Sequence, residues 1–281
     1  MTIGTIASRH EAGRTGATAW DRYGRGDGVP LVALHGWTDD GACWSPSIAR
    51  WVGGREVLTV DARGHGRTPL PEEPFTIAAL AGDVAAVVAE VLGRPTVVVG
   101  HSMGGLVAQE LALSAPELVA GLVLEDPAWR VGRVVDSRGI PVGLRDGVLA
   151  MAGREVDWLR DLGRQQNPGW PLDEIAPWAE AKHRVDPRVI DLPHRWDERD
   201  WGEALAAVRV PVTLLTGRPE RGAIVDAEQV RRVQDLLGPL LRHVPLPTGH
   251  SVRREARAEA EAAVLAALLE ADAGASALPQ R

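Results

Sequence analysis

The sequence has almost no cysteine, since Cys43 is the only one among 281 residues. A single cysteine excludes an intrachain disulfide, and it excludes a metal site built from several cysteines. No uninterrupted apolar run approaches the ~20 residues that a membrane-spanning helix needs. The stretch 1–16 is polar and mixed in charge, and it lacks the apolar core of a signal peptide. We therefore expect a cytoplasmic protein with no membrane partner.

Lysine, tyrosine and phenylalanine are also scarce. Lys182 is the only lysine among 31 Lys plus Arg residues, and Tyr23 and Phe75 stand alone beside ten tryptophans. A GC-rich genome gives such an arginine bias without any functional meaning, so we do not interpret the arginines as a binding patch. The net charge of −7 predicts no nucleic-acid partner, because the chain has no net positive field to hold phosphates.

What the chain does contain is apolar residues, 45% of the total, and a length that suits one large α/β domain with an insertion. Apolar, β-branched segments alternate with segments of helical periodicity. This alternation predicts a mostly parallel sheet covered by helices on both faces. We expect an initial antiparallel pair over 2–8 and 17–23, further strands over 30–35, 56–60, 95–99, 119–125, 210–216 and 240–246, and helices over 43–51, 76–92, 106–115, 226–237 and 255–270, with a frayed tail after 270.

The sequence pattern changes between residues 128 and 200, where polar segments of helical length are interrupted by prolines. Six of the ten tryptophans, at 129, 158, 170, 178, 196 and 201, lie in this stretch or at its edge. We expect a core domain formed by 1–127 and 201–281, with 128–200 inserted as a helical lid. A lid needs an apolar underside, so we expect Trp129 and Trp178 to contact substrate and other tryptophans to fill a local core. Lys182 lies one helical turn from Trp178, so it either shares the pocket wall or faces solvent.

A serine stands at the centre of the sequence Gly100-His101-Ser102-Met103-Gly104-Gly105. An apolar strand precedes this sequence and a Leu- and Ala-rich helix follows it, so the serine lies at the tip of a sharp strand-to-helix turn. The glycines permit the tight backbone, and the helix amino terminus favours developing negative charge. This is the G-x-S-x-G nucleophile elbow, and it predicts that Ser102 is a catalytic nucleophile rather than an ordinary loop serine.

A serine hydroxyl needs a base to take its proton and an acid to orient that base. His250 is the predicted base, because it follows the last strand and its loop opens at the same edge of the sheet as the elbow. Three other histidines, His35, His65 and His101, belong to tight turns with hydrogen-bonding roles of their own. The remaining four, His10, His183, His194 and His243, lack such a placement.

Two positions compete for the acid. Glu220 lies in the loop after the strand 210–216, and Asp126 lies directly after the strand 119–125. Both loops open toward Ser102 in a parallel sheet, so the sequence leaves the two alternatives equal, with Glu125 as a further candidate. Asp226 is expected to be a helix cap instead.

Acyl transfer also needs two backbone N–H groups that stabilise the developing oxyanion. We expect these from Met103, the residue after the nucleophile, and from Trp37, in the loop after the strand 30–35.

These motifs together resemble the α/β-hydrolase superfamily. The matching segments, in order, are His35-Gly36-Trp37, the sequence from Asp61 to Gly66, the elbow at 100–105, and Gly249-His250. The resemblance implies an α/β-hydrolase fold, with a mostly parallel eight-stranded sheet, a helical lid, and a serine triad that uses no metal or cofactor. Many members carry Asp in the loop where this chain has Glu220. Members such as the zearalenone lactonases place the acid after strand six instead, as Asp126 would be.

The fold does not fix the reaction. Dehalogenases and epoxide hydrolases use a carboxylate at the elbow, so a serine there argues against both. We expect hydrolysis of a small to medium, apolar or aromatic ester or lactone, by a monomer or homodimer. The alternatives are a carbon–carbon bond hydrolase of ring-fission products, a cofactor-free perhydrolase, and a ligand receptor on the same fold. A complete triad favours catalysis over the receptor, whereas slow turnover with tight ligand retention would favour the receptor.

Overall fold

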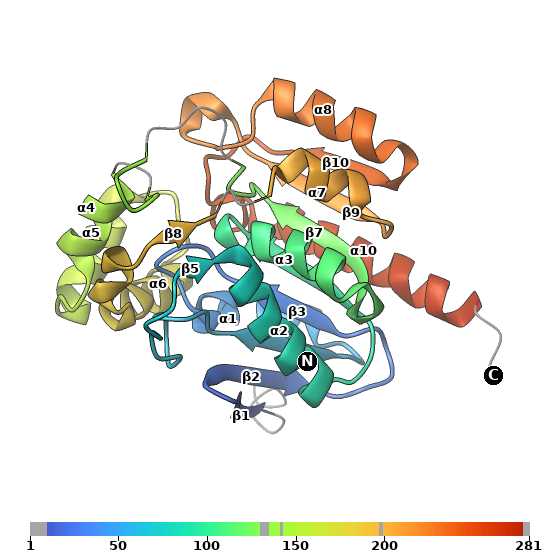
Figure 1. Cartoon of the computed structure of the whole chain (residues 1–281), viewed down its shortest axis with the longest axis horizontal. Coiled ribbons are helices and arrows are strands. Elements are labelled where there is room, and N and C mark those ends of the chain that lie inside the picture. Colours follow the sequence, from blue (N-terminus) through green and yellow to red (C-terminus); the bar gives the residue numbers. More distant parts are fainter. Residues whose placement is uncertain (1–9, 130–134, 141–142, 197–198, 278–281) are drawn as a thin grey trace.

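The computed structural model describes residues 10–129, 135–140, 143–196 and 199–277. Its centre is an eight-stranded sheet with the order β1-β2-β4-β3-β6-β7-β9-β10 (Figure 1). The strands are β1 His10–Thr15, β2 Thr18–Gly24, β3 Leu31–Leu34, β4 Glu56–Val60, β6 Thr96–His101, β7 Val119–Glu125, β9 Val212–Thr216 and β10 Leu241–Pro245.

Only the first two strands depart from the parallel arrangement. β2 pairs antiparallel with both β1 and β4, and every other neighbouring pair is parallel. The predicted α/β-hydrolase sheet is therefore confirmed. The predicted first strand over 2–8 lies outside the described residues, and the strand that pairs with β2 is instead His10–Thr15.

Neighbouring residues of the central strands divide between the two faces of the sheet. In β6, Val98 belongs to one apolar cluster, whereas Val97 and Val99 belong to the other. These side chains are essentially inaccessible to solvent. Because a strand points successive side chains to opposite faces, a continuous Val run fills the core on both sides.

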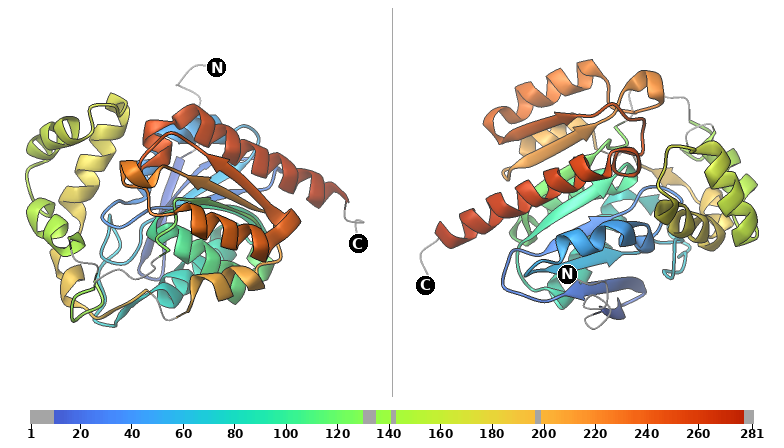
Figure 2. Two further views of the ribbon diagram at one scale, coloured as in Figure 1. Left: turned by 90° about the horizontal axis from the view of Figure 1, so that it is seen from above. Right: turned by 180° about the vertical axis from the view of Figure 1, so that it is seen from behind.

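Helices cover both faces (Figure 2). One face carries the helices that pack with α3, and the other carries α10 and α1. On the first face lie α2 Ile77–Val91, α3 Met103–Ser114, α7 Trp201–Ala207 and α8 Ala227–Leu237, and on the second lie α1 Ser45–Trp51 and α10 Arg257–Ala277. Short helical turns complete the core: η3 Gly41–Trp44, η4 Pro116–Leu118, η6 Pro219–Arg221, η7 Gly238–Leu240 and α9 Val252–Glu255.

Local capping determines where the helices begin. The Thr76 side chain accepts a hydrogen bond from the Ala79 N–H at 3.0 Å, and Asp226 forms a capping box with Gln229, as expected for both positions. The last helix differs from the prediction, because α10 continues to Ala277 instead of ending near residue 270. Its Ala-rich sequence has high helix propensity, so the chain does not fray where we expected.

Three helices of the segment 128–200 form a separate group at one end of the sheet (Figure 1). They are α4 Leu144–Met151, α5 Val156–Gln166 and α6 Leu172–Arg184. The chain then passes through η5 Pro187–Asp191 and returns to the core at β8 His194–Arg195, which pairs with β5 Phe75–Thr76 in a small parallel ladder.

Candidate active site

Ser102 lies in a strained turn between β6 and α3. Its φ of 54° is positive, which is unusual for a residue other than glycine. A Cβ atom on Gly100 would lie 2.2 Å from the carbonyl oxygen of Gly104, and one on Gly104 would lie 2.3 Å from that of Leu34. Glycine is therefore required where the turn folds back on itself and where the helix begins against β3. The Ser102 N–H donates to the Glu125 carbonyl at 3.0 Å, which attaches the turn to the end of β7.

The next residue after β7 contacts the predicted base. Asp126 is completely buried, and its Oδ2 lies 2.6 Å from Nδ1 of His250. The same carboxylate accepts hydrogen bonds from the N–H groups of Ile224, at 2.8 Å, and Val225, at 3.0 Å. Since a carboxylate only accepts, Nδ1 carries the proton, and this leaves the Nε2 lone pair of His250 free to act as a base.

Glu220, the other candidate acid, lies exposed in η6. Within the described residues it forms no hydrogen bond or ion pair with His250. The geometry therefore supports Asp126 and does not support the Glu220 alternative. The physical reason is that the chain turns sharply at Asp126, where φ is 38°, and this turn directs the carboxylate toward His250 and toward the two N–H donors.

His250 also contacts the strand that bears the nucleophile. Its ring centroid lies 4.7 Å from that of His101, and its carbonyl oxygen lies 3.1 Å from Nε2 of His101. Burial and the neighbouring His250 lower the pKa of His101 well below its ordinary value, so His101 is neutral at pH 7. Within the described residues the Ser102 hydroxyl forms no hydrogen bond with the imidazole, and such catalytic contacts often shorten only when substrate binds.

The loop after β3 passes directly beside the nucleophile. A Cβ atom on Gly36 would lie 3.3 Å from Cβ of Ser102. The loop forms a tight turn in which the Asp39 N–H donates to the Gly36 carbonyl at 3.1 Å, and Trp37 and Thr38 occupy its two central positions. Trp37 and Met103, whose N–H groups are the predicted oxyanion donors, are both buried.

Backbone strain is concentrated at this site. In the described ranges, the non-glycine residues with positive φ are Thr38, Ser102 and Asp126. Each such conformation costs about 1–3 kcal/mol and persists only where the surroundings enforce it. The three strained residues belong to the loop beside the nucleophile, to the nucleophile itself and to the residue that orients the base.

Glu125, the further candidate for the acid, has a different role. Its Oε1 accepts a hydrogen bond from the Arg253 N–H at 2.7 Å, so it connects β7 to the chain just after His250. Burial raises the pKa of Glu125, although the nearby Arg253 opposes that shift. Sequence reasoning missed this connection, because no local motif pairs β7 with residue 253.

The two tryptophans expected to contact substrate pack into apolar clusters. Trp129 is only 1% exposed, stacks on Trp201 with ring centroids 4.6 Å apart, and donates its ring N–H to Gln109 at 2.5 Å. Trp178 is buried in a small cluster with Leu159 and Ala179 of α5 and α6. Trp129 therefore offers almost no surface to a ligand.

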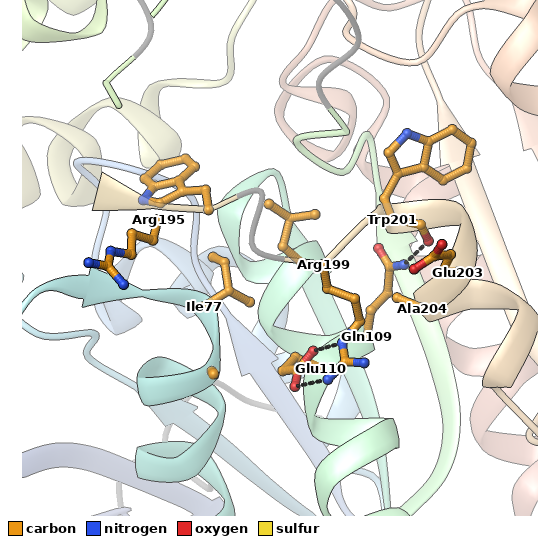
Figure 3. A pocket seen from close by; sticks show the side chains of 11 residues that line it. Ile77, Gln109, Glu110, Arg195, Arg199, Trp201, Glu203 and Ala204 are labelled. Atoms are coloured by element: carbon orange, nitrogen blue, oxygen red, sulfur yellow. Dashed lines mark hydrogen bonds and ion pairs between the residues drawn. The ribbon is translucent and has the colours of Figure 1, made fainter. Parts of the chain in front are cut away.

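A separate cleft opens on the flank of α3, between this helix and the segment that leads into α7 (Figure 3). Its volume is about 290 Å³, and its wall includes an ion pair between Arg199 and Glu110 at 3.0 Å. Ser102, Asp126 and His250 do not line this cleft.

Among the helices that the structure describes, none has both the length and the apolar character of a membrane-spanning segment.

The chain resembles known proteins along most of its length. The model of the alpha/beta hydrolase family matches residues 31–264. The lipase LipV of Mycobacterium tuberculosis is 40% identical over 121 residues, which are 41% of this chain and 46% of that protein. A pimeloyl-[acyl-carrier protein] methyl ester esterase of Methylococcus capsulatus is 29% identical over 231 residues, 79% of this chain and 74% of that protein. The chain spans less than half of the length of the first curated relatives that it matches.

Solved structures share the fold. An esterase from Rhodococcus superimposes with a TM-score of 0.68 at 24% identity, covering 93% of this chain and 98% of that one. An N-acyl homoserine lactone degrading enzyme superimposes with a TM-score of 0.65 at 22% identity, covering 92% of this chain and 99% of that one. At this level of identity the likeness shows the fold alone.

Proposed function

The chain belongs to the alpha/beta hydrolase family, and from this premise we propose that it is a serine hydrolase that cleaves carboxylic esters, lactones included, through an acyl-enzyme on Ser102. The observation that carries the proposal is the 2.6 Å contact between Asp126 and His250, next to a serine in a strained elbow. These residues are far apart in the sequence, and their convergence supports a Ser–His–Asp triad in which the serine–histidine hydrogen bond forms when substrate binds.

In the first half of the reaction, Oγ of Ser102 attacks the ester carbonyl while Nε2 of His250 takes the hydroxyl proton. Asp126 holds the Nδ1–H and stabilises the imidazolium that forms. The negative charge on the tetrahedral intermediate is stabilised by the N–H groups of Met103, at the start of α3, and Trp37.

The intermediate then collapses, and His250 returns the proton to the departing alkoxide. A simple ester releases its alcohol, whereas a lactone opens and keeps the new hydroxyl attached to the acyl group. A water molecule then attacks the acyl-enzyme, with His250 again taking the proton, and Ser102 is restored.

The proposed substrate is a small to medium, apolar or aromatic ester or lactone. The names of two sequence relatives, a lipase and a methyl ester esterase, support ester chemistry. We propose that 128–200 acts as the lid, with Trp178 as the candidate for substrate contact and Trp129 as support for α3. The oligomeric state stays a prediction of monomer or homodimer, which size-exclusion chromatography with light scattering would decide.

The test combines labelling with turnover. A fluorophosphonate probe should label the wild-type protein at Ser102, as peptide mass spectrometry would show, and a panel of chromogenic esters and lactones should reveal the preferred acyl group. Ser102→Ala should abolish labelling and reduce kcat by about 10⁶-fold, with an unchanged circular dichroism spectrum. Undiminished turnover in this variant would refute the proposed nucleophile, and hydrolysis of ring-fission diketones without ester turnover would favour the carbon–carbon alternative.

A further inference from the structure

Three charged side chains meet in a buried position between the loop after β3, the lid helix α6 and α9. Nζ of Lys182 lies 2.6 Å from Oδ1 of Asp39, and Nη2 of Arg254 lies 2.8 Å from Oδ2 of the same carboxylate. All three side chains are at most 6% exposed. We call Asp39, Lys182 and Arg254 the Asp39 cluster.

Lys182 also contacts the strained turn beside the nucleophile. Its Nζ donates to the carbonyl oxygen of Thr38 at 3.1 Å. Thr38 is β-branched and has a φ of 66°, a conformation that such a residue adopts only under constraint. The carbonyl held by Lys182 therefore belongs to a strained residue, one position after Trp37.

Arg254 connects the same carboxylate to the loop that bears the base. It lies in α9, four residues after His250. The adjacent Arg253 is attached to β7 through its N–H bond to Glu125. The Asp39 cluster thus joins the loop that carries one proposed oxyanion donor to the segment that carries the base.

A second carboxylate, from α6, lies beside the cluster. Glu174, at the start of α6, lies 3.0 Å from Arg253 and 3.6 Å from Arg254. Burial by itself would raise the pKa of Asp39, but Arg254 and Lys182 hold it well below its ordinary value, so the carboxylate is charged. Buried ion pairs stabilise a fold poorly compared with apolar side chains of the same volume, so stabilisation of the fold alone does not explain this arrangement.

We propose that Lys182 and Asp39 are positioning residues for catalysis: they hold the Trp37–Thr38 turn in the conformation of an oxyanion hole and, through Arg254, fix its place relative to the His250 loop. The inference rests on the proposed function and deepens it, because it assigns to the lid helix a part in organising the reacting groups. Both side chains are buried, so they would act through the turn and not by direct contact with substrate.

The test uses Lys182→Met and Asp39→Asn, two changes that nearly preserve side-chain volume. The matched control is Arg184→Gln, since Arg184 lies on the same helix and pairs with Asp40, the neighbour of Asp39, at 2.6 Å. For each protein, active sites are titrated with the fluorophosphonate, and kcat is expressed per titrated site. KM, the melting temperature and the inhibition constant of an arylboronic acid, which mimics the tetrahedral intermediate, are measured in parallel.

We expect kcat per titrated site to fall about 10- to 100-fold in Lys182→Met and Asp39→Asn, because a small displacement of reacting groups has effects of this size. The boronic acid should bind more weakly by a similar factor, with KM changed less than about three-fold, because an oxyanion hole acts mainly on the transition state. Arg184→Gln should leave kcat per site within about two-fold of the wild type.

A lower melting temperature with normal kcat and normal boronic acid affinity per site would overturn the inference and leave the proposed function intact. Failure of the probe to label wild-type Ser102 would overturn both. Where a single variant folds poorly, the double variant Asp39→Asn/Lys182→Met removes both members of the Lys182–Asp39 pair and leaves Arg254 with Glu174, 3.6 Å away. It should be impaired about as much as either single variant, because both residues act on one turn. Wild-type kcat per site in the double variant would contradict the proposal.

Discussion

The sheet core and the helix pair α5–α6 are held in place by different forces. The central strands bury Val and Leu side chains in two large apolar clusters, one on each face of the sheet. The helices α5 and α6 bury only a small cluster of their own, centred on Leu159, Trp178 and Ala179. α6 is joined to the core by several buried charged side chains, among them Glu174 and Lys182.

The difference matters because the two kinds of interaction specify structure differently. Apolar burial is non-directional and scales with area, so it stabilises the sheet as a whole. Charged hydrogen bonds require defined partners and angles, so they fix the place of α6 relative to particular residues. In this protein those residues are the strained turn at Thr38 and the segment after His250.

The largest expected effect concerns the candidate catalytic site, at the edge of the sheet core. Asp126→Asn should lower the acylation rate by about 10⁴-fold, since an amide cannot hold His250 in the required tautomer. Glu220→Gln, a matched removal of charge from an exposed residue, should leave the rate unchanged. Stopped-flow measurement with a chromogenic ester distinguishes the two, and a larger fall in Glu220→Gln would contradict the assignment of the acid.

Two leucine truncations compare the stability of the regions. Leu122 in β7 and Leu159 in α5 are both fully inaccessible to solvent, and each change to Ala should cost about 2–5 kcal/mol locally. Leu122→Ala should shift the whole urea transition, because it opens a cavity in the main core. Leu159→Ala should mainly increase amide hydrogen exchange in α5 and α6. Equal loss of protection throughout the sheet in Leu159→Ala would show that α5 and α6 do not unfold separately.

Acid sensitivity should come from the core. Burial lowers the pKa of His65 to about 3, and burial with His250 nearby also depresses the pKa of His101. Between pH 6.5 and 5 the unfolded chain therefore binds protons that the folded chain does not, so stability falls as the pH falls. Each histidine contributes up to about 1.4 kcal/mol per pH unit, a limit reached once the pH is well below the unfolded pKa of ~6.5. Urea unfolding at pH 7, 6 and 5 should show this dependence of the unfolding free energy on pH. His65→Gln should reduce the slope by the contribution of one histidine, and an unchanged slope would refute the neutral state of His65.

The smallest effect concerns Trp178 in the proposed lid. Trp178→Ala should raise KM about five-fold, or ~1 kcal/mol, and change the preferred acyl group, because the proposed pocket wall is removed. Trp158→Ala is the control, since Trp158 is 48% exposed on the neighbouring helix and should leave the substrate profile unchanged. A lower melting temperature with an unchanged profile in Trp178→Ala would make Trp178 a core residue only.

Much of the site could be predicted because its residues stand next to local signals. Ser102 lies between a strand and a helix with glycines that the turn requires, and His250 follows the last strand of the sheet. Asp126 and Glu220 could not be separated in this way, since both follow strands that end at the same edge. The choice depends on the backbone at Asp126 and on N–H donors almost a hundred residues further along the chain.

Lys182 shows the limit of local reasoning. Its place one helical turn from Trp178 predicted either the pocket wall or solvent, and its Nζ does lie 5.2 Å from the centre of the Trp178 ring. Yet the side chain is buried against Asp39, so the solvent-facing alternative is wrong. Nothing in helical periodicity could indicate a partner on the loop after β3.

The order of apolar and polar residues along the chain determined the layered sheet, the serine elbow and the histidine loop. These features follow from strand and helix periodicity and from turn glycines, which are patterns of a few neighbouring residues. Only the tertiary structure decided which carboxylate contacts His250 and which charges hold α6 to the strained turn. Those choices depend on distances between segments that are remote in sequence. Electrostatic and hydrogen-bond energies depend strongly on distance and angle, which residue type alone does not fix.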